Sequence, residues 1–112
     1  MQKLYLVSPY SHEDEKVREE RYDAAVDATT ALIKKDYIVY SPIVHCHPLA
    51  LKHSLPTDHK YWKEYNQAFI EWTDVGYVLR IPGWRESLGV LADIAALCRL
   101  GKPVFNSDSD PL

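Results

Sequence analysis

Residues 74–106, "DVGYVLRIPGWRESLGVLADIAALCRLGKPVFN", carry the pattern that decides the fold. The apolar run 74–81 is typical of a buried strand, and the turn sequence "PGWRE" follows it. Ser87 is a favourable N-cap for a helix that ends near Leu100, where Gly101 is a favourable stop. "KPVFN" then predicts a further strand. A strand, a helix and a strand in succession favour two parallel strands with the helix packed on the sheet.

The residues before this segment repeat the alternation. "KLYLVS" (3–8) and "YIVYSP" (37–42) predict two more strands, and a proline ends the second one. Apolar residues at three- and four-residue spacing predict a helix over about residues 13–35. Thr57 is a suitable cap for another helix that runs from about residue 58 to residue 72.

The sequence therefore predicts the α/β fold class. We expect one domain over residues 1–112, built as a three-layer sandwich with helices on both faces of a mostly parallel sheet of four or five strands. The polar residues 106–112 at the end of the chain are expected to fray.

The composition excludes several classes of partner. The chain of 112 residues has a net charge of −3, so it lacks the basic excess that holds a nucleic-acid backbone. No signal peptide and no apolar run long enough to span a membrane is present. The two cysteines follow no disulfide pattern, which fits reduced thiols in the cytoplasm. We expect a cytoplasmic protein that binds neither membranes nor polymeric nucleic acid.

A ligand site is expected where the predicted parallel strands end. In open α/β sheets, ligands bind outside the carboxyl ends of the strands. Ser8 and Tyr10 follow the first strand, His45 follows the second, and Trp84 follows the third. Aromatic rings at these positions could stack on a planar base, although core packing is the alternative for most of the tyrosines.

Two groups of residues could bind an anion. The Ser87 hydroxyl and the backbone N–H groups of Leu88 and Gly89 open a helix, and a glycine lets a ligand approach the backbone closely. An ordinary N-cap is the alternative. Arg18 and Arg21 share one face of the first predicted helix, and Arg21 falls on its apolar stripe, where it needs an anionic partner. A surface salt bridge to a nearby carboxylate is the alternative for the arginines.

Asp93 is a candidate catalytic carboxylate. It falls at the edge of the apolar stripe of the last predicted helix, where aspartate is an unfavourable residue. That stripe is predicted to consist of Val90, Leu91, Ile94, Leu97 and Cys98. A half-buried carboxylate one turn beyond an anion site suggests a function. Its alternative role is to pair with Arg99 or another basic group.

The segment 41–62, "SPIVHCHPLALKHSLPTDHKYW", contains four of the five histidines and is predicted to begin as a loop. Its histidines and Cys46 could be zinc ligands, but their spacing matches no closed structural zinc site. We therefore expect no metal. A lid over the ligand or a contact between subunits is the more economical interpretation, with His45 ending the second strand at the site.

Four quoted stretches taken in order resemble one known family. "LYLVSPYS", "VYSPIVH", "TDVGYVL" and "GWRESLGV" followed by an aspartate and "LGKPV" are similar to the nucleoside 2-deoxyribosyltransferase superfamily. The resemblance is closest to its small phage and bacterial members and to the 2′-deoxynucleoside 5′-monophosphate N-glycosidases. It implies a Rossmann-like parallel sheet and homodimers or higher oligomers in which neighbouring subunits can help to complete each site.

The resemblance also implies roles for individual residues. Tyr5 matches a strand tyrosine that touches the nucleophile, and Asp93 stands where the family has its nucleophilic glutamate. Ser87 and Gly89 match the phosphate-binding turn of the monophosphate glycosidases. Asn66 falls where relatives often have a second carboxylate.

The implied activity is cleavage of the N-glycosidic bond of a 2′-deoxynucleoside 5′-monophosphate, by hydrolysis or by base transfer, without a cofactor. Because retaining glycosidases use a carboxylate nucleophile, Asp93 would attack the anomeric carbon with Tyr5 orienting it. His45 or water is expected to assist the leaving base. The alternative is a catalytically weakened protein of the same fold that binds or sequesters a small nucleotide or nucleoside.

Overall fold

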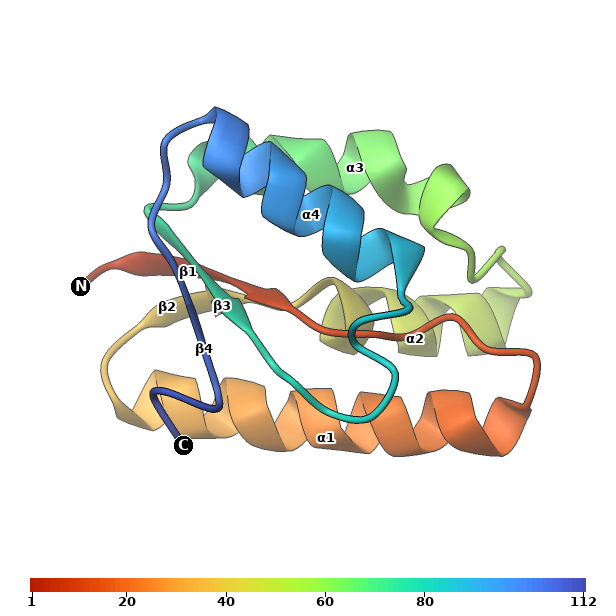
Figure 1. Cartoon of the computed structure of the whole chain (residues 1–112). Coiled ribbons are helices and arrows are strands. Elements are labelled where there is room, and N and C mark those ends of the chain that lie inside the picture. The colour runs from red at the N-terminus through yellow and green to blue at the C-terminus, as the bar shows by residue number, and fades with distance from the viewer.

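The computed structural model describes residues 1–112 as three layers (Figure 1). A sheet of four parallel strands lies between α1 on one face and α3 and α4 on the other. The strands are β1 (Lys3–Val7), β2 (Ile38–Tyr40), β3 (Val75–Val78) and β4 (Val104–Asn106), in the spatial order β2-β1-β3-β4. The helices are α1 (Glu15–Lys34), α2 (Pro42–His53), α3 (His59–Trp72) and α4 (Leu88–Arg99). The predicted α/β sandwich with a parallel sheet is confirmed, and the sheet has four strands.

The central strand β1 carries the core on both of its faces. Leu4 and Leu6 pack in the cluster that includes the apolar side of α1, whereas Tyr5 and Val7 pack in the cluster that includes Val90 of α4. Side chains alternate between the faces of a strand, so a strand covered on both sides must be apolar at every position. This requirement explains the continuous apolar run at the start of the sequence.

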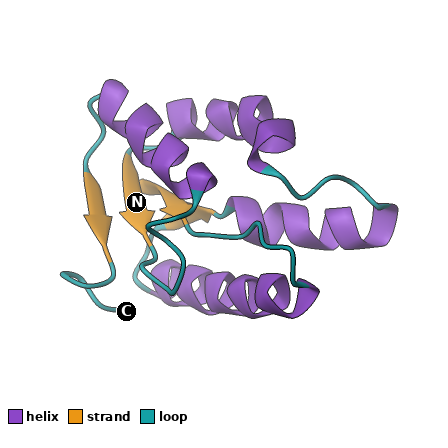
Figure 2. Ribbon diagram, turned by 45° about the vertical axis from the view of Figure 1, so that its right-hand side comes forward, coloured by secondary structure: helices purple, strands orange, loops and turns teal.

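The helix α2 was not predicted, because residues 42–53 were interpreted as part of a loop. Ser41 is the N-cap, since its side chain accepts a hydrogen bond from the Val44 N–H at 3.2 Å, and Pro42 occupies the first turn. Proline is favourable there because the first N–H groups of a helix have no partner within the helix. Pro42 therefore both ends β2 and begins α2. Figure 2 shows α2 lying along α1, with which it is in contact.

Smaller differences concern the limits and faces of two helices. The N-cap of α3 is Asp58 and not Thr57, since the Asp58 carboxylate accepts a hydrogen bond from the Tyr61 N–H at 3.2 Å. Ser87 caps α4 as predicted. Leu91 and Cys98 are exposed, which narrows the predicted apolar stripe of α4.

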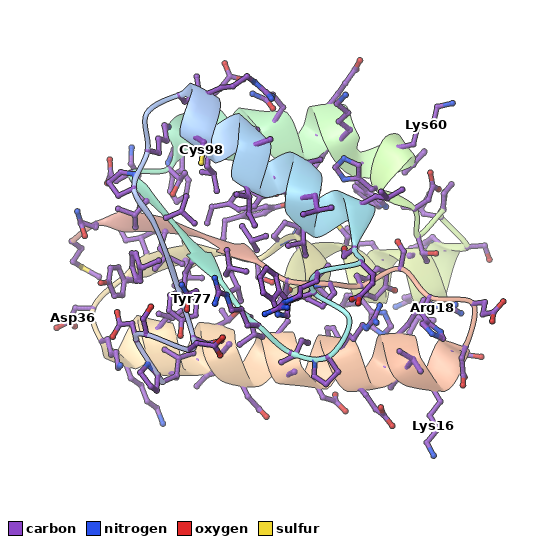
Figure 3. The ribbon with its side chains drawn as sticks, in the orientation of Figure 1. Lys16, Arg18, Asp36, Lys60, Tyr77 and Cys98 are labelled. Atoms are coloured by element: carbon purple, nitrogen blue, oxygen red, sulfur yellow. The ribbon has the colours of Figure 1, made fainter.

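The last residues are held against the sheet instead of extending freely. Asn106 is the last residue of β4, and the Tyr77 hydroxyl of β3 donates to the Asp110 carbonyl oxygen at 2.8 Å (Figure 3 labels Tyr77). The Arg80 N–H donates to the Ser107 hydroxyl oxygen at 2.9 Å, and the Arg80 guanidinium lies 3.1 Å from the Asp108 carboxylate. Residues 106–110 of the segment expected to fray are therefore part of β4 or in contact with β3 and the loop that follows it.

None of the four helices combines the length and the apolar composition that a membrane crossing requires.

The side chain of Lys102 closes the carboxyl end of α3. Its ammonium group donates to the carbonyl oxygens of Ile70, Glu71 and Thr73 at 2.9, 2.5 and 2.6 Å. The last carbonyl groups of a helix have no partner within the helix, and a cation there also interacts favourably with the helix dipole. Lys102 therefore joins the α4–β4 connection to the end of α3.

We predict that Lys102→Met lowers the free energy of unfolding by about 2 kcal/mol, because it removes hydrogen bonds from a charged donor to three carbonyl groups. Thermal and urea denaturation measure the change. Lys16→Met is the matched control, because the Lys16 side chain points away from α1 into solvent (Figure 3). Equal stabilities of the two variants would contradict the capping role.

Candidate active site

A cavity of about 480 Å³ opens at the carboxyl end of the sheet. Its wall is formed by residues 8–11 after β1, by the inner side of α2, by residues 57–66 at the start of α3, and by the first turns of α4. The volume is in the range of small-molecule sites. The cavity therefore lies where the sequence predicted a ligand site.

Asp93 lines this cavity and is bonded to the centre of the sheet. The hydroxyl of Tyr5, a fully buried residue of β1, donates to Oδ2 of Asp93 at 3.2 Å. Burial raises the pKa of Asp93 from 3.8 to about 7, and the hydrogen bond from Tyr5 opposes this shift. Burial, and then the neighbouring Asp93, also raise the pKa of Tyr5 well above its usual value, so Tyr5 remains a hydrogen-bond donor. The Asp93 carboxyl can thus change its charge near neutral pH.

The first turn of α4, which we call the α4 turn (Ser87, Leu88 and Gly89), presents unpaired donors to the cavity. The Ser87 hydroxyl oxygen accepts from the Val90 N–H at 3.2 Å, so its own hydrogen is free to donate. The N–H groups of Leu88 and Gly89 donate to no protein acceptor, as expected for the first residues of a helix. Three donors at a helix N-terminus form a favourable environment for an anion.

Asn66 forms part of the wall that α3 contributes. It is buried, and its side-chain oxygen accepts from the Tyr40 hydroxyl at 3.1 Å. This contact fixes the orientation of the amide, so the NH₂ group remains as a donor to a ligand. Asn66 therefore lies in the cavity wall, with a neutral side chain that is held in one direction.

Ser8 and Tyr10 also line the cavity, in the loop after β1. The Ser8 hydroxyl oxygen is inaccessible to water and has no hydrogen-bond partner in the protein. The Tyr10 hydroxyl lies 2.5 Å from Nδ1 of His47. Next to them, the Ser11 hydroxyl donates to the Thr57 carbonyl oxygen at 2.9 Å and joins this loop to the segment before α3.

His45 and Trp84, two of the predicted site residues, are not part of the cavity wall. His45 lies in the first turn of α2, where Nε2 is 2.7 Å from the Tyr65 hydroxyl and the two rings stack. The unpredicted helix α2 turns this side chain towards α3. Trp84 lies in the loop after β3, with the guanidinium groups of Arg80 and Arg85 near its ring at 4.5 and 5.4 Å.

Arg18 and Arg21 bind backbone carbonyl groups instead of reaching the α4 turn. Arg18 donates to the His12 carbonyl oxygen. Arg21 donates to the Ser11 carbonyl oxygen at 2.9 Å, and its guanidinium lies against Gly83, whose φ of 92° favours glycine. The anionic partner expected for Arg21 is thus replaced by carbonyl oxygens, and Arg21 supports the loops after β1 and β3.

The five histidines have separate surroundings. His12 Nδ1 accepts from the Asp14 N–H at 2.9 Å, His45 contacts Tyr65, and His53 ends α2. His47 and His59, described below, complete the set. No three His, Cys, Asp or Glu side chains gather in an arrangement that could hold a metal ion. The segment 41–62 therefore comprises α2, the connection to α3 and the first residues of α3, and its histidines lie in different surroundings.

Two residues of the wall that could act chemically were considered from the sequence only as possible zinc ligands and not as residues of the ligand site. His59, the first residue of α3, lies against Gly89, and burial lowers its pKa, followed by the effect of Lys63. Cys46 of α2 lines the cavity, and burial raises the pKa of its thiol to about 11. Neither could be assigned beforehand, because their contacts depend on a helix and a cap that the sequence pattern did not predict.

We predict that Asp93→Asn stabilises the protein above neutral pH. Between pH 3.8 and about 7 the folded state holds a proton on Asp93 that the unfolded chain has lost, so wild-type stability falls as pH rises through this window. The gain of Asp93→Asn should therefore vanish at acid pH and reach a few kcal/mol above pH 7. Thermal denaturation across this pH range measures it.

The matched control is Asp27→Asn, because Asp27 is exposed on α1. A gap between Asp93→Asn and the wild type that does not change with pH would contradict the assignment of a raised pKa to Asp93.

Comparison with known proteins gives two findings. A family model described as a domain of unknown function, DUF1937, matches residues 2–109. The 2-deoxyribosyltransferase of the psychrotolerant bacterium Bacillus psychrosaccharolyticus has a similar structure, with a TM-score of 0.63 and 22% sequence identity over 93% of this chain and 70% of that enzyme. No curated protein matches the sequence. The chain therefore belongs to the DUF1937 family, and it shares its fold with this 2-deoxyribosyltransferase.

Proposed function

We propose that the chain cleaves the N-glycosidic bond of a 2′-deoxynucleoside 5′-monophosphate. The observation that carries the proposal is the position of Asp93, a partly buried carboxyl with a pKa of about 7 that shares one cavity with the unpaired donors of the α4 turn. A group whose pKa is shifted by burial and by a specific partner, in a cavity, is a candidate for catalysis. The fold shared with a 2-deoxyribosyltransferase supports a deoxynucleoside-type substrate.

Asp93 acts as the nucleophile in this proposal. Oδ2 is held by the Tyr5 hydroxyl, which leaves Oδ1 to attack the anomeric carbon while the bond to the base breaks. Water then hydrolyses the glycosyl ester and releases deoxyribose 5-phosphate. Because the nucleophile must be ionised, kcat/KM should rise with pH as the solution passes about pH 7.

The two ends of the cavity favour the two ends of a nucleotide. The α4 turn offers hydrogen-bond donors that suit a 5′-phosphate. The α2 side of the cavity is apolar and suits the base, and Asn66 adds one oriented amide donor. The lining residues from α2 are Pro42, Ile43, Cys46 and Ala50.

Binding without cleavage is the second candidate function. Asn66 favours it, because an amide occupies a position at which an acid could assist the reaction. We further propose that the chain acts as a homo-oligomer in the cytoplasm, as the resemblance and the cysteine usage indicate. Size-exclusion chromatography with light scattering tests the oligomeric state.

The deciding experiment mixes the purified protein with each 2′-deoxynucleoside 5′-monophosphate and each nucleoside, and follows free base by chromatography. We predict that Asp93→Asn lowers base release about a hundredfold or more, because it removes the attacking charge and keeps the shape of the side chain. Asp93→Glu, which extends the side chain by about 1.5 Å, tests whether the reach of the carboxylate is matched to the cavity.

Two results would count against this assignment. Full activity of Asp93→Asn would move the chemistry to another residue. Clear nucleotide binding by a wild-type protein that releases no base would favour the binding function. Circular dichroism of all three proteins checks that each variant is folded.

We predict that the wild type binds a monophosphate at least about tenfold more tightly than its nucleoside, since hydrogen bonds to a charged group contribute roughly 1.5–3 kcal/mol. Ser87→Asp should abolish this difference, because aspartate preserves the N-cap but repels the phosphate. Nucleoside affinity should stay unchanged. Isothermal titration calorimetry measures both affinities, and equal wild-type affinities would contradict a phosphate site at the α4 turn.

A further inference from the structure

A chain of three titratable side chains connects the cavity to the surface. Tyr10 lines the cavity, and its hydroxyl lies 2.5 Å from Nδ1 of His47. Nε2 of His47 lies 2.8 Å from the Glu19 carboxylate. The His47 side chain is 3% exposed and that of Glu19 is 50% exposed. The three residues, which we call the Tyr10 relay (Tyr10, His47 and Glu19), come from the loop after β1, from α2 and from α1.

The geometry of the relay is firmly held. Both ring nitrogens of His47 have a partner, and the Tyr22 ring stacks on the imidazole at 4.3 Å between ring centroids. The Tyr10 ring meets the same imidazole edge-on. A histidine with a carboxylate on one nitrogen has its orientation and its tautomer fixed, so the other nitrogen points at a defined partner. That partner is Tyr10.

The relay can place a proton at the cavity. When His47 is the imidazolium paired with Glu19, Nε2–H donates to the carboxylate and Nδ1–H donates to the Tyr10 oxygen. The Tyr10 hydroxyl hydrogen is then free to point to a ligand. Burial raises the pKa of Tyr10 despite the opposing effect of Arg18, so Tyr10 holds its proton until a strong acceptor forms beside it.

The proposed reaction requires such a proton. A base that leaves with the electron pair of the glycosidic bond is a poor leaving group unless it is protonated or hydrogen-bonded. Asp93 is committed as the nucleophile, Asn66 has no proton of suitable acidity, and His45 lies outside the cavity wall. His59 lies against Gly89 at the phosphate end, whereas the Tyr10 relay is anchored on α2, which forms the base end.

We propose that Tyr10 is a further catalytic residue of this site, the acid that protonates the leaving base, and that His47 and Glu19 are positioning residues that supply and recover its proton. This inference rests on the proposed glycosidase function and adds to it the origin of the proton. It assigns a use to a buried histidine that the nucleophilic step does not need.

The protons balance over the two steps. In the first step Asp93 bonds to C1′, the electron pair of the C1′–N bond goes to the base, Tyr10 gives its proton to the base, and His47 gives its Nδ1 proton to Tyr10. In the second step water attacks C1′ and releases Asp93, while the proton of the water passes to Tyr10 and the Tyr10 proton returns to His47. One water is consumed, and one free base and one deoxyribose 5-phosphate are formed.

The experiment compares two leaving groups on the full-length protein. One substrate is a natural 2′-deoxynucleoside 5′-monophosphate, and the other carries 4-nitrophenolate in place of the base, which departs as a stable anion and needs no proton. We expect Tyr10→Phe to lower kcat about a hundredfold with the natural base and by less than about threefold with 4-nitrophenolate. Glu19→Gln, which keeps a hydrogen bond to His47 without the charge, should show a smaller loss with the same dependence on the leaving group.

Tyr22→Phe is the matched control. It keeps the ring that stacks on the His47 imidazole and removes only the Tyr22 hydroxyl, which makes no hydrogen bond to the protein. It should leave both rates unchanged. Calorimetry of nucleotide binding and thermal denaturation check that Tyr10→Phe is folded and still binds. A merely structural role of Tyr10 would lower both rates equally.

The possible outcomes separate the two proposals. Equal losses for the two leaving groups, or no loss with the natural base, would overturn the role of Tyr10 and leave the glycosidase function in place. A loss that depends on the leaving group in His59→Gln but not in Tyr10→Phe would move the acid to His59. Absence of base release by the wild type would overturn the glycosidase function and this inference with it.

Discussion

The hydrogen bond between Tyr5 and Asp93 is the contact on which the organisation of the site depends. It requires β1 at the centre of the sheet, so that a phenol can be buried below the cavity, and α4 packed on the same face. Burial raises the pKa of Asp93 from 3.8 to about 7, which means that near neutral pH this carboxyl is held at a cost in stability. Stability alone would favour an apolar pair here, and a cost of this kind is characteristic of functional sites.

The sequence predicted the architecture well where the local signals agree with one another. In residues 74–106 the apolar run, the Ser87 cap and the Gly101 stop all support the same elements. In residues 41–58 the signals conflict, because histidines and prolines suggest a loop while Ser41 followed by Pro42 is a typical helix start. Helix α2 was therefore missed because its N-cap was not recognised, and the predicted fold class did not depend on it.

Whether a predicted site residue lies at the cavity depends on what determines the direction of its side chain. Ser8, Asn66, Ser87 and Asp93 lie at the cavity, because a strand end, a helix cap or the edge of an apolar stripe determines where each side chain points. His45, Trp84 and Arg21 do not, because their directions depend on tertiary partners. The Tyr10 relay joins residues that are 37 and 28 positions apart, and no spacing rule predicts such a contact. Distances within an element can be predicted from periodicity, whereas contacts between elements require their packing.

The bridge from the Ser11 hydroxyl to the Thr57 carbonyl oxygen has a kinetic consequence. It joins two segments that both line the cavity, and it is exposed, so its net contribution is on the order of 1 kcal/mol. A contact of that size breaks and re-forms easily, so it slows neither the entry nor the departure of a ligand by much. The loop after β1 and the segment before α3 are therefore joined without being locked together. The residence time of a ligand at this site is set by the contacts that the ligand itself makes with the cavity wall.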